Sequence, residues 1–117
     1  MIQKLISIGM KKKFNKLVRD RIPAICRADG WEPKTKILSA SAFKKFLKLK
    51  LVEEAKELAA ANSRELKNEI VDVYELLLTT AKTFGLRWAD IEQMRKEKNK
   101  KRGGFSKRIF LIETHKK

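Results

Sequence analysis

Apolar and polar residues recur with a helical period through the middle of the chain. Apolar positions spaced three and four residues apart predict two amphipathic helices, separated by a polar break at Asn62–Ser63. The first stripe consists of Phe43, Phe46, Leu47, Leu51 and Leu58. The second consists of Leu66, Ile70, Val73, Leu77 and Phe84, flanked by Tyr74 and Leu76. The second stripe is wider than one partner helix can cover, which indicates a helical bundle and is compatible with its completion by a second subunit.

Local signals predict where these two helices begin and end. Ser39 or Ser41 is suited to cap the first helix. Asn62 followed by Glu65 resembles a capping box for the second. Gly85, directly after the second stripe, is typical of a helix end.

The flanking segments are shorter or more polar. Pro23 is placed to open a short helix that ends near Gly30. Trp31–Leu38 is extended, as a strand or a loop. A third helix, basic in its later part, is expected over about Trp88–Lys101, and a glycine pair follows it. Arg108–Glu113 has the composition of a strand. The fold class expected is therefore all-α, with short extended segments near both ends.

Length and charge limit the alternatives. The 117 residues suit one domain, which we assign to residues 14–117 after an N-terminal extension at 1–13. A net charge of +15 indicates a polyanionic partner, either a nucleic acid, a nucleotide or an acidic lipid surface. The single cysteine, Cys26, excludes an internal disulfide framework and suits a cytoplasmic protein. No apolar run approaches the roughly 20 residues of a membrane span, so we expect no membrane association.

Carboxylates interrupt both apolar stripes at mirrored positions. Glu54 and Glu57 share one face of the first helix, and Glu69 and Asp72 share one face of the second. If the helices form an antiparallel hairpin that turns at Ser63, Glu57 and Glu69 are equidistant from the turn, and so are Glu54 and Asp72. The hairpin would then gather four carboxylates at nearly one level.

Such a cluster needs a counter-charge, because like charges in a partly dry site repel strongly. Oxygen-only ligands suit Mg²⁺, or Mn²⁺ in its place, better than zinc. The alternative is a salt-bridge lattice in which Lys50 and neighbouring bases neutralise these acids. Arg95, Lys98 and Arg102 share a face of the third helix and are suited to bind phosphates, or else form a solvated basic face.

Three blocks resemble the MazG-like all-α nucleoside triphosphate pyrophosphohydrolases, in particular the phosphoribosyl-ATP pyrophosphohydrolase-like branch. The blocks are Lys16–Pro23, Lys50–Glu57 together with Glu69–Asp72, and Arg102–Phe105. The resemblance implies a helical bundle assembled as a homodimer or homotetramer. It implies Mg²⁺ held by the four mirrored acids, Glu54, Glu57, Glu69 and Asp72. It also implies cleavage between the α and β phosphates of a nucleotide, giving a monophosphate and pyrophosphate.

The remaining roles follow from the same resemblance. Glu53, beside the ligand set, is the candidate to position or deprotonate the attacking water, a role that any of the four ligand acids, including Glu54, can share. Lys98 and Arg102 match basic positions of the family and are expected to contact phosphate, as is Arg19. The substrate's base and sugar stay open.

A nucleic-acid-binding module is the main rival interpretation. The lysines suit backbone contacts, but aromatic residues for single-strand stacking are sparse in the basic segments. This interpretation also leaves the mirrored carboxylates unexplained. We therefore expect an enzyme, with nucleic-acid binding as a secondary property at most.

Overall fold

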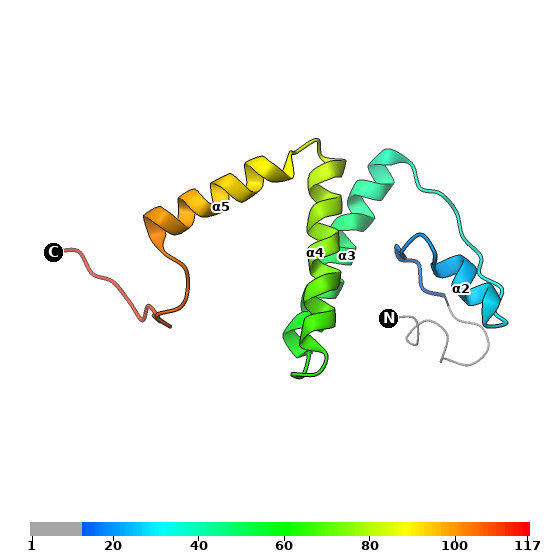
Figure 1. Ribbon diagram of the computed structural model, residues 1–117, viewed down its shortest axis with the longest axis horizontal. Helices are drawn as coiled ribbons and strands as arrows, with labels where there is room; N and C mark the ends of the chain where they lie inside the picture. The colour runs from blue at the N-terminus through cyan, green and yellow to red at the C-terminus, as the bar shows by residue number, and fades with distance from the viewer. Residues whose placement is uncertain (1–12) are drawn as a thin grey trace. The chain divides into compact units, whose positions relative to one another are not determined.

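The computed structural model describes residues 13–117, so the predicted N-terminal extension lies almost wholly outside the described residues. The described chain forms four helices (Figure 1): α2 (Ile22–Ala28), α3 (Ala40–Ala60), α4 (Leu66–Thr83) and α5 (Trp88–Arg102). No β-strand occurs within these residues, which confirms the all-α class. The chain divides into two compact units between Thr80 and Ala81.

The strand predicted at Arg108–Glu113 is wrong, because these residues have no regular secondary structure. At Trp31–Leu38 the loop alternative is the one found. A strand needs a partner to bind its backbone N–H and C=O groups. Neither segment has one among residues 13–117, so β-propensity alone does not produce a strand.

The predicted helix boundaries are confirmed for the first two helices. Pro23 lies in the first turn of α2, where its missing N–H removes no intrahelical hydrogen bond. Ser39 is the N-cap of α3, and its side chain accepts a hydrogen bond from the Ala42 N–H at 3.2 Å. Ser41, the other candidate, lies inside the helix.

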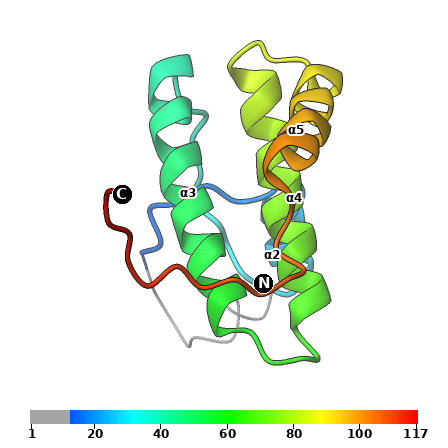
Figure 2. The ribbon, with the colours of Figure 1, turned by 90° about the vertical axis from the view of Figure 1, so that its left-hand side faces the viewer.

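Helices α3 and α4 lie side by side and form a hairpin (Figures 1 and 2). The capping box predicted in their connection is confirmed. Asn62 Oδ1 accepts from the N–H groups of Arg64 and Glu65, each at 3.0 Å. In return, Glu65 Oε1 accepts from the Asn62 N–H at 3.1 Å. This reciprocal pair sets the point at which the chain turns.

Replacing Asn62 by Ala is expected to lower the free energy of unfolding by about 1 kcal/mol, because two backbone N–H groups lose their acceptor. Urea denaturation monitored by circular dichroism measures this change. Ser63→Ala, at the next exposed position, is the matched control. Equal stability of the two variants would contradict the capping role of Asn62.

The described part of the first unit buries few apolar side chains. Ile22 of α2 and Leu47 of α3 are buried. On α4, by contrast, the predicted apolar stripe stays half-exposed at Leu66, Ile70 and Leu77. Helix α3 therefore covers only part of that stripe.

The second unit contains the last residues of α4, then α5 and the C-terminal segment. Gly85, with φ of 73°, follows α4 as predicted, and the Leu86 N–H donates to the Ala81 carbonyl at 2.8 Å. Helix α5 buries no residue and ends at Gly103, whose φ is 80°. Beyond it the chain exposes five large apolar side chains: Phe105, Ile109, Phe110, Leu111 and Ile112. Across the described residues, no helix has both the length and the apolar character of a membrane span.

Candidate metal centre

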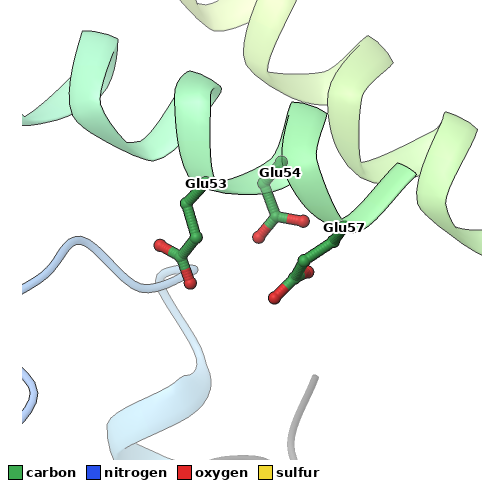
Figure 3. Close-up of side chains that lie close together, drawn as sticks. All are labelled: Glu53, Glu54 and Glu57. Carbon is green, nitrogen blue, oxygen red and sulfur yellow. The ribbon is translucent and has the colours of Figure 1, made fainter. Parts of the chain in front are cut away.

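Three carboxylates on α3 project to the same side of the helix (Figure 3). One oxygen each from Glu53, Glu54 and Glu57 lies within 4.8 Å of the other two. The spacing of these residues along α3 produces this grouping, because positions three and four apart share a helix face.

The hairpin brings two carboxylates of α4 close to Glu54. One oxygen each from Glu54, Glu69 and Asp72 lies within 4.8 Å of the others. Glu54 thus belongs to both groups and joins them. Glu57 groups with its neighbours on α3, whereas Glu69 and Asp72 complete the group across the hairpin. The mirrored spacing about the turn therefore predicts the grouping of Glu54 with Glu69 and Asp72, whereas Glu57 does not join the group across the hairpin.

Glu54, Glu69 and Asp72 are buried, which is unusual for carboxylates. Glu54 is 1% exposed, Asp72 is 8% and Glu69 is 9%. The Oε2 atoms of Glu54 and Glu69 are buried without a hydrogen-bond partner among the described residues. An unpartnered buried polar atom costs about 1–3 kcal/mol, and more when it is charged. The cluster contains two such atoms, and both oxygens are available as ligands for a cation.

Lys50 supplies a positive charge within the acidic cluster. Its ammonium, on a residue only 7% exposed, lies 3.2 Å from Glu54 Oε1 and 3.4 Å from Glu53 Oε2. Together with the Lys16–Glu53 and Arg19–Asp72 ion pairs, the salt-bridge alternative is therefore realised for Glu53, Glu54 and Asp72. One ammonium cannot neutralise the whole cluster, however, and it makes no ion pair with Glu69 or Asp72 across the hairpin. Lys50 neutralises part of the negative charge of the cluster, and the charge that remains is compatible with the binding of a metal cation.

Burial raises the pKa of Glu54, and the neighbouring Glu57 carboxyl raises it further. The Lys50 ammonium acts in the opposite direction. The net rise in pKa means that the buried site favours the neutral acid over the carboxylate. A cation bound here would act like the Lys50 ammonium, because a nearby positive charge favours the ionised form of Glu54 and lowers its pKa.

Two basic residues of the N-terminal segment reach the cluster. Lys16 Nζ donates to Glu53 Oε1 at 2.7 Å, and Arg19 Nη2 donates to Asp72 Oδ1 at 2.8 Å. The resemblance predicted a phosphate contact for Arg19, whereas Lys16 was named only as the first residue of the block Lys16–Pro23. Helical periodicity carries no information on contacts between segments so distant in sequence, so no local signal identifies the Lys16–Glu53 pair.

The other predicted phosphate contacts, Lys98 and Arg102, lie exposed on the later turns of α5 in the second unit. Arg95, expected on the same face, is held by Glu92, with Nη2 and Oε1 2.6 Å apart. The basic side chains that follow Arg95 on α5 are thus exposed to solvent in the second unit.

The donor set fits a hard divalent cation. All five acids offer oxygen, the ligand type that Mg²⁺ and Mn²⁺ prefer, and neither cysteine nor histidine is among them. Comparison of the chain with protein-family models, with curated proteins and with solved structures gives no match.

Proposed function

We propose that the protein is a Mg²⁺-dependent nucleotide pyrophosphohydrolase. It cleaves the α–β phosphate bond of a nucleoside triphosphate, or of a related nucleotide such as phosphoribosyl-ATP, to a monophosphate and pyrophosphate. The observation that carries the proposal is the buried group of Glu54, Glu69 and Asp72, with two unpartnered carboxylate oxygens. The resemblance of the three sequence blocks to MazG-like enzymes supports the same activity.

In this proposal Glu54, Glu57, Glu69 and Asp72 hold the ion. When bound, Mg²⁺ supplies charge that neutralises phosphate oxygens and helps to orient a water for in-line attack. The α3–α4 hairpin keeps the carboxylates in place, and their burial excludes bulk water from the ion's ligands. Arg19 orients Asp72 through its hydrogen bond, as partners of metal ligands commonly do.

Glu53 is the candidate to position the attacking water. Both of its oxygens accept from ammonium groups, Oε1 from Lys16 and Oε2 from Lys50. Each of these oxygens keeps a second lone pair that can accept a proton or a hydrogen bond from water. Glu54, with its raised pKa and its unpartnered Oε2, is the second candidate for that role.

A second copy of the chain completes the bundle in this proposal. The support is the half-exposed apolar stripe on α4, with Ile70 and Leu77 at its centre. A hairpin whose apolar face is incompletely covered gains stability by packing against another hairpin. The oligomeric form is a homodimer or a homotetramer.

The test is a panel of nucleoside triphosphates plus phosphoribosyl-ATP, incubated with Mg²⁺ or with EDTA. Release of pyrophosphate rather than orthophosphate, dependent on Mg²⁺, is the expected result. No release from any nucleotide, together with no Mg²⁺ binding by calorimetry, would overturn the proposal. The lysines would then be assigned to a polyanionic partner, testable by salt-sensitive binding of random DNA or RNA.

A further inference from the structure

A cleft of about 440 Å³ opens beside the acidic cluster, between the segment leading into α2 and the start of α4. Its lining combines two guanidinium groups, one amide, one carboxylate and three aliphatic side chains. The residues are Arg19, Arg21, Ile22, Ile25, Asn68, Val71 and Asp72. Such a mixture of apolar wall and few polar groups is typical of small-molecule sites, which range from about 300 to 1,000 Å³.

Asp72 belongs both to the cleft and to the buried carboxylate group. A ligand in the cleft therefore lies next to the candidate cation site. Arg19 also lines the cleft, and a guanidinium has five N–H donors, of which the structure uses one on Asp72. The remaining donors of Arg19, and those of exposed Arg21, are suited to a phosphate group in bidentate geometry.

Three aliphatic side chains also line the cleft. Ile22 and Ile25 come from α2, and Val71 comes from α4. Val71 is 52% exposed, so its side chain has room for a partner. A flat heterocycle packs well against such side chains, and the amide of Asn68 can both donate to and accept from a base edge.

We propose that this cleft binds the nucleoside part of the substrate, with the base against Ile25 and Val71 and the α phosphate towards Arg19. The proposal rests on the proposed function and specifies where its nucleotide substrate binds: a ligand seated in the cleft directs its phosphates towards Asp72. Asn68 is then a specificity-determining residue. The assignment follows from the position of the cleft beside the acids, its volume and the combination of guanidinium, amide and aliphatic side chains in its lining.

The experiment measures binding of AMP, GMP, CMP, UMP and dTMP to the full chain in EDTA by NMR titration. Ribose 5-phosphate, which has the phosphate but no base, is measured alongside. The variant Val71→Trp fills the cleft from an exposed position, and Asn68→Ala removes the amide. Lys67→Ala, an exposed neighbour on α4 outside the lining, is the matched control.

We expect at least one monophosphate to bind more tightly than ribose 5-phosphate. Val71→Trp should weaken that binding at least tenfold, Asn68→Ala should change the order of preference among bases, and Lys67→Ala should do neither. Equal binding of ribose 5-phosphate, no binding of any monophosphate, or indifference to Val71→Trp would each overturn the inference. Because this assay needs neither Mg²⁺ nor turnover, its result is distinct from that of the pyrophosphate assay. If Val71→Trp leaves Mg²⁺-dependent pyrophosphate release unchanged, the assignment of the cleft as the nucleoside site is overturned, while the proposed function stands.

Discussion

Glu54→Gln is expected to lower pyrophosphate release by about two to three orders of magnitude, the range for removing one electrostatic group from a reaction centre. Glu54 is the residue shared by the two carboxylate groups, so its loss removes a ligand from both. Gln keeps the shape of the side chain but not its charge. Calorimetry without nucleotide should show weakened Mg²⁺ binding in the same variant, which separates loss of the ion from loss of chemistry.

The variant should still fold. The raised pKa of Glu54 means that, above the ordinary value of 4.5, ionisation of this buried group disfavours the folded state in the absence of metal. Gln has no charge at any pH, which removes this penalty, and Lys50 keeps Glu53 as an ion-pair partner, so the metal-free variant should remain folded at neutral pH. Glu75→Gln, with the same charge change on α4 outside the cluster, is the control. Full activity and unchanged Mg²⁺ affinity in Glu54→Gln would contradict the assignment of the site.

Lys50→Met is expected to destabilise the metal-free protein by about 3 kcal/mol at pH 7.5, because breaking a buried ion pair leaves an uncompensated charge. Lys50 lowers the pKa of Glu54, so its removal lets that pKa rise further. The destabilisation is present in full above the folded-state pKa of Glu54. It disappears at pH below 4.5, where the acid is protonated in both the folded and the unfolded protein.

Urea denaturation at pH 7.5 and at pH 4 measures this difference. Mg²⁺ should raise the stability of Lys50→Met more than that of the original protein, since the ion then replaces the missing ammonium. Lys56→Met, an exposed lysine on the same helix, is the control and should show neither effect. Equal stability of Lys50→Met and the original protein at both pH values would mean that Lys50 does not compensate the buried carboxylate.

Local sequence signals predicted the helices and the convergence of the acids. The capping box at Asn62 and Glu65 and the glycine at Gly85 are determined by residues within one turn of each boundary. The grouping of Glu54, Glu69 and Asp72 needs only a helical period and a turn position, and both can be read from the sequence.

The contacts that the sequence did not predict depend on how distant segments pack. The cleft beside Asp72 and the Lys16–Glu53 pair arise where the N-terminal segment meets the hairpin. The hydrophobic periodicity of the sequence carries no information on the contact between these two parts of the chain. The strand expected at Arg108–Glu113 failed for a related reason, since strand formation depends on a partner elsewhere in the fold.

The acidic cluster lies within a single hairpin, and this affects how the protein folds. Closing the short connection between α3 and α4 is enough to bring Glu54 to Glu69 and Asp72, and closing a short loop is fast. Repulsion among the carboxylates therefore opposes one early, local step rather than final assembly. A proton on Glu54, the Lys50 ammonium and a divalent cation all relieve that repulsion, so each should speed hairpin closure as well as stabilise its product.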